Sequence, residues 1–426
     1  MKFDVYLDWR PVGTLLSERG RLRFTYLSDV IEEDGPALSV RLPPRTEPYT
    51  HGAVHSYFAN LLPEDEYGRL VARTLGVSER NVAGMLGAIG GECAGAVSIW
   101  PEGEAPSLKP DYQPVPEEAL DRLLDAADAS ERMAVVRDNR LSLAGGMEKL
   151  ALLERKGTWW RGMAGAPTNR ILKWPQPQFP DQNYNELFCL ELWREVGLPV
   201  PLARVLGRTT AVLVVERYDR LAHTGDQSPR QIHQEDFCQA LGLDSTRKYQ
   251  GGGDRGPGLA NSAEVIRAHC SGPARGLLLL VRWALANFLT GNGDGHGKNL
   301  SLLHAPDGIR LAPFYDVAST LAYSGLSRKL AMAVGGEYRF AYVRARHWER
   351  LADELDIAPT AVRQDAELLA DEFERAMEPV HASLAGRYGD QPMFAKVADI
   401  VTEQIALLRA NLPATSRTRK GRHTDA

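Results

Sequence analysis

The chain has 426 residues, of which 44% are hydrophobic and 25% are charged, and its formal net charge at pH 7 is −5. This length exceeds that of a typical single domain, so we expect two or three packed units. The acidic balance argues against a generic nucleic-acid binder, whose surface would carry a basic excess. The longest apolar stretch, residues 276–290, contains Arg282 and is shorter than the roughly 20 residues of a membrane span.

The cysteines and the N-terminal segment indicate the cytoplasm. Four cysteines are scattered without a CxxC pair or zinc-like spacing, at positions 93, 189, 238 and 270. Such spacing is typical of reduced, mostly buried thiols rather than of disulfides or metal ligands. The first residues, MKFDVYLDWRPVG, lack the continuous apolar core of a secretory signal. We therefore expect a cytoplasmic protein without membrane contact.

The N-terminal part of the chain is predicted to form a mixed α/β unit. Residues 22–26 alternate between apolar and polar side chains, which is the period of a half-buried strand, and a further strand is predicted at 5–7. Helical spacing of apolar residues indicates helices at 53–62 and 67–75. Residues 84–96 are rich in Gly and Ala, which indicates close backbone packing, with a phosphate-binding loop as the alternative.

An extended segment leads from this unit to a second one. Pro, Glu and Asp are dense between residues 101 and 116, which is typical of a linker, and an amphipathic helix is predicted at 117–127. A βαβ-like pattern follows. Its strands are predicted at 150–153, 170–174, 203–206 and 211–215, and its helix at 185–197.

Beyond about residue 230 the pattern is mainly helical, with long amphipathic runs at 359–383 and 392–411. The last residues are polar and basic, and we expect a disordered tail. The sequence thus predicts an α+β chain with a two-lobed, protein-kinase-like fold, in which a nucleotide lies between a sheet lobe and a helical lobe. The predicted parts are a mixed unit (1–105), a linker with a short helix (106–134), a sheet lobe (135–220), a helical lobe (221–412) and a tail (413–426).

The most specific motif lies in the helical lobe, where residues 291–316 read GNGDGHGKNLSLLHAPDGIRLAPFYD. Asp294 is followed five positions later by Asn299, and an apolar run leads to Asp316. A phosphoryl-transfer centre needs one carboxylate to accept the proton of the attacking hydroxyl, and an Asn and a second Asp to hold divalent ions. Asp294 is therefore the candidate catalytic residue, with Asn299 and Asp316 as candidate Mg²⁺ ligands. The alternative is a Gly-, Asn- and Asp-rich turn between core segments.

The sheet lobe supplies candidate ATP contacts. Lys173 lies in an apolar strand and can hold the phosphates of ATP, unless it is a surface lysine of an alternating strand. Glu186, at the predicted start of the next helix, would pair with Lys173, although a carboxylate is also favourable there because of the helix dipole. Gly145 and Gly146 can bring backbone N–H groups close to phosphates, with an ordinary turn as the alternative.

Four further residues are candidates for supporting roles. Glu216 and Tyr218 end the last strand before the helical lobe, where the backbone of a kinase-like enzyme meets the adenine edge. His296 could act as a base, although its position in the loop favours a structural hydrogen bond. Lys298, beside the candidate metal ligand Asn299, could neutralise charge on the transferred phosphate.

Six ordered blocks of the chain resemble the HipA-type serine/threonine kinases, which are the toxins of HipBA toxin–antitoxin pairs. The blocks are SLAGGMEKLAL (142–152), ILKWP (171–175), VERYDR (215–220), QEDFCQALG (234–242), NGDGHGKNLSLL (292–303) and APFYDVAST (312–320). The resemblance extends from the N-terminal strands to about residue 410. It implies a HipA-like fold and an activity that depends on ATP and Mg²⁺.

The resemblance also implies roles for matching positions. These roles are catalysis for Asp294, magnesium binding for Asn299 and Asp316, contact with ATP phosphates for Lys173, and lining of the adenine site for Glu216 and Tyr218. Ser142 matches an autophosphorylated serine beside the phosphate-binding loop, which here includes Ala144, Gly145 and Gly146. The family commonly reads AGAQEK at this loop. Met147 replaces its Gln, which removes one amide contact and leaves the backbone cradle.

For the whole protein, the resemblance implies growth arrest by phosphorylation of a translation component, typically an aminoacyl-tRNA synthetase. It further implies a dimeric helix-turn-helix antitoxin that supplies the main contacts to operator DNA. Phosphate on Ser142 would add about −1.5 to −2 charges beside the triphosphate and switch the enzyme off. A catalytically quiet co-repressor and a small-molecule kinase stay open as alternatives. The intact set of Lys173, Asp294, Asn299 and Asp316 argues against the co-repressor.

Overall fold

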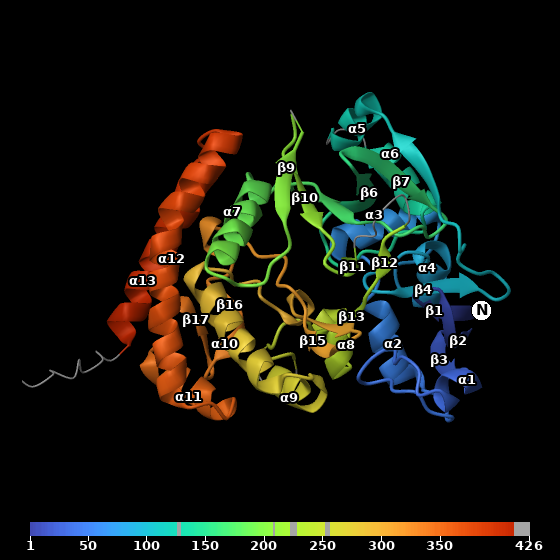
Figure 1. Ribbon diagram of the computed structural model, residues 1–426, viewed down its shortest axis with the longest axis horizontal. Helices are drawn as coiled ribbons and strands as arrows, with labels where there is room; N and C mark the ends of the chain where they lie inside the picture. The colour runs from blue at the N-terminus through green and yellow to red at the C-terminus, as the bar shows by residue number, and fades with distance from the viewer. Residues whose placement is uncertain (126–128, 208, 222–227, 252–255, 413–426) are drawn as a thin grey trace, which may run out of the picture.

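The computed structural model describes residues 1–125, 129–207, 209–221, 228–251 and 256–412 (Figure 1). The predicted tail at 413–426 therefore lies outside the described residues. The first unit is a four-stranded antiparallel sheet in the order β3-β2-β1-β4, covered by helices. Its elements are β1 (Lys2–Leu7), β2 (Arg10–Glu18), β3 (Arg21–Tyr26), α1 (Ser28–Glu32), α2 (His51–Ala59), α3 (Asp65–Leu75), α4 (Val82–Ile89) and β4 (Val97–Pro101).

The alternation in β3 has the expected cause, since Leu22, Phe24 and Tyr26 are buried and the residues between them are more exposed. The Gly/Ala-rich segment after residue 83 packs closely, as predicted. A Cβ at Gly90 would lie 2.6 Å from Leu86 O in the last turn of α4 and 3.1 Å from Ile99 Cβ of β4, so a side chain has little room at this end of the helix.

The second unit is a six-stranded antiparallel sheet in the order β5-β7-β6-β8-β10-β9. Its elements are β5 (Asp111–Val115), α5 (Glu117–Leu124), α6 (Ala129–Asp138), β6 (Lys149–Arg155), β7 (Thr158–Met163), β8 (Arg170–Lys173), α7 (Gln182–Glu195), β9 (Ala203–Leu206) and β10 (Val212–Glu216). Two expectations are corrected here. Part of the predicted linker is the edge strand β5, and the βαβ-like pattern is an antiparallel sheet that contains the unpredicted strand β7.

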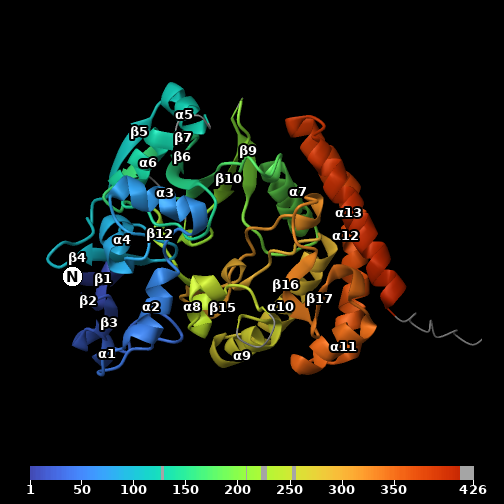
Figure 2. The same ribbon diagram turned by 180° about the vertical axis from the view of Figure 1, so that it is seen from behind.

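The third unit is mainly helical, as expected. Its helices are α8 (Phe237–Leu241), α9 (Leu259–His269), α10 (Pro273–Leu289), α11 (Ala345–Glu354), α12 (Pro359–Tyr388) and α13 (Pro392–Asn411). Short antiparallel sheets accompany them: β11 (Arg220–Leu221) with β12 (Arg230–Gln231), β13 (His233–Asp236) with β14 (Ser301–Ala305) and β15 (Gly308–Leu311), and β16 (Lys329–Val334) with β17 (Glu337–Arg339). Both ribbon views place α12 and α13 at the end of the molecule opposite the N-terminal sheet (Figures 1 and 2).

Two large hydrophobic cores divide the molecule. One joins the N-terminal sheet to the six-stranded sheet, and the other holds the helical unit together with α7. Helix α7 therefore packs on α12 and α13 although the chain reaches it from β8. The result is a two-lobed α+β fold whose lobes meet along α7, β8 and β10.

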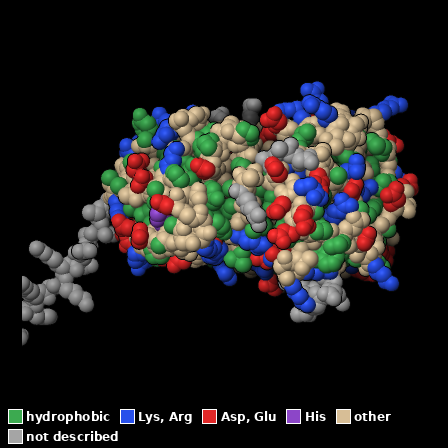
Figure 3. Space-filling view, turned by 90° about the horizontal axis from the view of Figure 1, so that it is seen from above, with side chains coloured by type: hydrophobic (Ala, Val, Ile, Leu, Met, Phe, Trp, Pro, Cys, Tyr) green, Lys and Arg blue, Asp and Glu red, His purple; other side chains and the backbone are tan. Residues whose placement is uncertain are grey.

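Charged side chains of both signs are intermixed over the face seen in Figure 3. All four cysteines are buried and free. Among the described residues, the helices lack the length and apolar character that crossing a membrane would require.

Candidate active site

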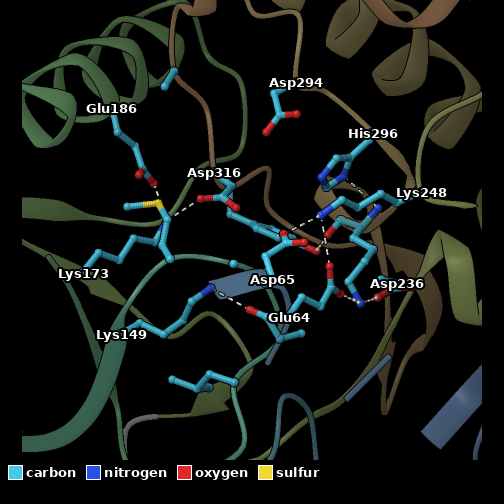
Figure 4. A pocket seen from close by; sticks show the side chains of 18 of the residues that line it. Glu64, Asp65, Lys149, Lys173, Glu186, Asp236, Lys248, Asp294, His296 and Asp316 are labelled. Carbon is cyan, nitrogen blue, oxygen red and sulfur yellow. Dashed lines mark hydrogen bonds and ion pairs between the residues drawn. The ribbon is translucent and has the colours of Figure 1, made fainter. Parts of the chain in front are cut away.

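A cavity of about 840 Å³ opens between the lobes. The sheet lobe contributes β8, the end of β10 and the glycine segment before β6, and the helical lobe contributes the loops after α10 and after β15. Side chains at the start of α3, from the N-terminal unit, complete one wall (Figure 4). The cavity therefore collects residues from all three units.

Lys173 is the last residue of β8 and is only 6% exposed, so the surface-lysine alternative is wrong. Its Nζ lies 2.6 Å from Glu186 Oε1 and 2.6 Å from Asp316 Oδ1, and these contacts join the two lobes (Figure 4). Burial alone would lower the pKa of Lys173, but the charges of Asp316 and Glu186 raise it above its usual value. Lys173 is thus held as a cation in the cavity. Glu186 lies in the second turn of α7, beyond the first turn where the helix dipole attracts carboxylates.

Asp294 lies in the loop after α10, and its side chain is exposed to the cavity. The loop is held from behind, because Asn292 Nδ2 donates to Asn287 Oδ1 of α10 at 2.6 Å and Asn292 Oδ1 accepts from Asp294 N at 2.9 Å. A Cβ at Gly293 would lie 2.5 Å from Lys329 O, so the close approach of the loop to β16 requires glycine there. The backbone therefore fixes where the Asp294 carboxylate can point.

Asn299 and Asp316 lie side by side, and Asn299 Nδ2 is 3.5 Å from Asp316 O. Asn299 Oδ1 is buried and accepts no hydrogen bond from the described residues, which is unusual for a buried amide oxygen. Burial would raise the pKa of Asp316, but Lys173 and Lys149 hold it well below its usual range, so the carboxylate is ionised. Asp316 also has the uncommon φ of 59°. A free amide oxygen beside an ionised carboxylate fits the oxygen ligands of Mg²⁺.

The glycine segment forms a tight loop over the cavity. Gly145 has φ +104°, which favours glycine, and a Cβ at Gly146 would lie 2.6 Å from Asp65 Oδ2. Lys149 Nζ donates to Ala144 O at 2.6 Å and so ties this loop to β6. Burial lowers the pKa of Lys149 to about 8. Sequence reasoning missed Lys149, although it adjoins an apolar strand in the same way as Lys173.

Met147 and Ser142 flank this loop differently. Met147 Sδ lies 3.3 Å from Gln182 Nε2 at the start of α7, so its side chain contacts the helix. Ser142 is fully buried, its Oγ donates to Leu61 O at 2.8 Å, and its N–H donates to Glu92 O at 2.8 Å. The hydroxyl of Ser142 therefore faces the N-terminal unit, and a phosphate there requires the segment to leave this position.

Glu216 and Tyr218 both line the cavity. The backbone N–H of Glu216 already donates to Leu202 O at 2.8 Å, so this group is not free for an adenine ring. The ring of Tyr218 lies 5.6 Å from that of Tyr315, and its hydroxyl donates to Gln234. The aromatic surface here is therefore built by residues from both lobes.

His296 makes a structural hydrogen bond, since its Nδ1 accepts from Lys298 N at 3.3 Å at the start of the turn Gly297–Asn299. Burial lowers its pKa, so the ring is neutral. The contacts of Lys298 argue against its expected role in neutralising charge on the transferred phosphate. Its Nζ lies within 3.0 Å of Asn60 Oδ1, Asn60 O, Asp236 Oδ2 and Glu64 Oε1. An ammonium has three N–H donors, so these contacts occupy Lys298 in joining the N-terminal unit to the loop after α10.

Nothing in the local sequence predicted that several other residues would line the cavity. Lys248 Nζ pairs with Glu64 at 3.0 Å, and the hydroxyl of Tyr249 donates to Asp294 Oδ1. Glu64 lies at the cap of α3, nearly two hundred positions before Lys248, and only the fold brings them together.

The fold and the site together define the structural class of this protein. A sheet-lobe lysine paired with a helix glutamate faces two loops of the helical lobe, of which one carries Asp294 and Asn299 and the other carries Asp316. This is the arrangement of a two-lobed, protein-kinase-like fold.

Comparisons with known proteins identify the family. The HipA N-terminal domain matches residues 3–100, and the HipA-like C-terminal domain matches residues 141–380. The chain belongs to the HipA family.

Similar proteins support this assignment. The protein named "Putative kinase Y4mE" of Sinorhizobium fredii is 35% identical over 96% of this chain and 99% of its own length. The serine/threonine-protein kinase toxin HipA of Shewanella oneidensis is 31% identical over 68% of each chain. HipA in the solved complex of Shewanella oneidensis HipA, HipB and operator DNA superposes with a TM-score of 0.82 and 26% identity, covering 95% of this chain and 96% of that chain.

Proposed function

We propose that the protein is a serine/threonine kinase that uses Mg²⁺ and ATP and acts in the cytoplasm as the toxin of a toxin–antitoxin pair. The observation that carries this proposal is the convergence of Lys173, Asp294 and Asp316 on one cavity, with Asn299 buried directly beside Asp316. The family supports it, since a relative is named a serine/threonine-protein kinase toxin.

The chemistry of each side chain suggests a separate role in phosphate transfer. Asn299 and Asp316 would hold Mg²⁺, which neutralises phosphate charge when it is bound. Lys173 is held cationic and can bind phosphate oxygens, while Glu186 fixes its position. The loop of Ala144, Gly145 and Gly146 can offer backbone N–H groups to phosphates. Asp294 accepts the proton of the attacking hydroxyl, and Glu216 and Tyr218 line the end of the cavity left for the base.

For partners, we propose a dimeric, helix-turn-helix antitoxin like HipB, which carries the protein to operator DNA. The similar Shewanella HipA was solved with HipB and operator DNA, which supports this. The acidic net charge of −5 fits a chain that leaves the main DNA contacts to its antitoxin. The proposed substrate is a translation component such as an aminoacyl-tRNA synthetase.

Growth on induced expression tests the toxin role. The wild-type chain should arrest growth, and Asp294→Asn should restore it, because the variant keeps the fold and loses the proton acceptor. Phosphoprotein mapping in both cultures would identify the substrate. Equal arrest by both chains would remove kinase activity as the cause and favour the quiet co-repressor.

Phosphorylation of Ser142 is the proposed off-switch. Because the Ser142 hydroxyl is buried against Leu61 O, a phosphate of about −1.5 to −2 charges cannot stay there and would displace the loop of Gly145 and Gly146. We expect the purified phosphorylated form to lose transfer activity, and treatment with a phosphatase to restore it. A phosphorylated form as fast as Ser142→Ala would contradict the switch.

A further inference from the structure

Tyr249 lies in the segment between α8 and α9, at the rim of the cavity. Its hydroxyl donates to Asp294 Oδ1, and its ring meets the His296 ring edge-on, with 5.1 Å between centroids. Burial and the charge of Asp294 raise the pKa of Tyr249 above its usual value, so the hydroxyl stays protonated and remains a donor.

The hydroxyl that receives the phosphate must donate a hydrogen bond to Asp294. The hydroxyl of Tyr249 already makes this same contact. The proton acceptor of a transfer reaction has to lie within hydrogen-bond reach of the attacking hydroxyl. Tyr249 makes this contact from within the chain. Water or a substrate hydroxyl must therefore compete with Tyr249 for the same carboxylate.

The backbone on both sides of Tyr249 is fixed. Lys248 O accepts from Gly297 N at 3.0 Å, while Gln250 N donates to Ala331 O at 3.2 Å and Gln250 Oε1 accepts from Ala333 N at 2.7 Å. The residue itself is 46% exposed. The side chain can thus rotate toward solvent while the segment stays in place, so displacement leaves the hydrophobic core intact.

We propose that Tyr249 is a built-in occupant of the acceptor position, which an incoming hydroxyl must displace before transfer. This inference rests on the proposed kinase function and adds a residue that controls access to Asp294. The consequence is selectivity: an acceptor that makes further contacts with the protein displaces Tyr249, whereas water does not.

Basal ATP hydrolysis reports on this competition without a known substrate. In that reaction a water oxygen attacks the γ-phosphorus, the bond from this phosphorus to the oxygen of ADP breaks, and the water proton passes to Asp294. Tyr249→Phe removes the competing hydroxyl and keeps the ring. Tyr112 of β5 offers a matched control, because it is not among the residues that line the cavity and its hydroxyl donates instead to Pro167 O at 2.8 Å.

The experiment measures hydrolysis of γ-labelled ATP with Mg²⁺ under single-turnover conditions. We expect Tyr249→Phe to raise the basal rate roughly 10-fold. This factor corresponds to the free energy of one hydrogen bond to a charged group, which water no longer has to displace. The KM for ATP of Tyr249→Phe and the rate of Tyr112→Phe should stay at wild-type values. Tyr249→Leu removes the ring as well and should show at least the same increase.

Two results would overturn the proposal, and they differ from each other. If the wild type hydrolyses ATP and both Tyr249 variants are unchanged or slower, Tyr249 only positions Asp294, and the kinase proposal survives. If the wild type neither binds nor hydrolyses Mg²⁺–ATP, the proposed function fails and this inference fails with it.

Discussion

Asp294→Asn should reduce phosphate transfer by about 10²–10⁴-fold, the usual contribution of a general base or hydroxyl-orienting carboxylate. The amide keeps the shape of the side chain and can still accept from Tyr249, but it cannot take up the proton of the acceptor. Because Asp294 is exposed to the cavity and the loop is held by Asn292 and Asn287, the melting temperature should be unchanged. The assay is single-turnover transfer from γ-labelled ATP.

Asp307→Asn is the matched control for this variant. Asp307 lies between β14 and β15, its side chain is exposed, and it pairs with Arg310 rather than with any cavity residue. The same chemical change there should leave the rate at the wild-type value. An Asp294→Asn protein that transfers phosphate at the wild-type rate would show that another group accepts the proton.

Arg217→Met should cost roughly 3–5 kcal/mol of stability, the usual effect of removing one partner of a buried ion pair. Arg217 is buried after β10, where its guanidinium contacts Glu92 at 2.7 Å and Asp219 at 2.9 Å. Arg220 contacts the same two carboxylates at 2.9 and 3.0 Å. Four charges therefore balance within the interior, and the variant leaves two buried carboxylates with one cation.

Urea unfolding gives the measurement, and Arg137→Met gives the control. Arg137 is an exposed residue of α6 that pairs with Asp138, so its loss should cost at most about 1 kcal/mol. Comparable losses in the two variants would mean that the buried network contributes no more than a surface pair. Because Glu92 belongs to the N-terminal unit, we also expect the unit to become more susceptible to proteolysis in Arg217→Met.

Acid should weaken the same network. Burial would raise the pKa of Asp219, but Arg217 and Arg220 lower it to about 2, below the value of 3.8 for a free Asp. The stabilisation from Asp219 is therefore present above about pH 4 and is lost as the pH falls toward 2.

The sequence predicted those parts whose signal is local. The spacing of Asp294 and Asn299 singled out the loop that places Asp294 at the cavity, and Lys173 was singled out because a charged residue interrupts an apolar strand. The amphipathic runs that form α12 and α13 lie within the observed helices because their apolar faces pack on α7 and α10.

Other parts had no local signal or a misleading one. Strand β5 contains Pro114 and follows a Pro-rich segment, so it resembles a linker, yet it is an edge strand, where proline is tolerated. Lys298 seemed directed at phosphate because it adjoins Asn299. Its true partners, Glu64 and Asp236, come from elsewhere in the chain, and only the tertiary fold reveals them.

On the proposed function, Lys173, Asn299 and Asp316 present the γ-phosphate of Mg²⁺–ATP to a hydroxyl at Asp294. Parallel incubations of the wild-type chain with γ-labelled and α-labelled ATP test it most directly. We expect label on serine or threonine from γ-labelled ATP only, and none when EDTA removes Mg²⁺. Label from α-labelled ATP would mean transfer of the nucleotide instead, and label from neither would mean that this cavity does not transfer phosphate.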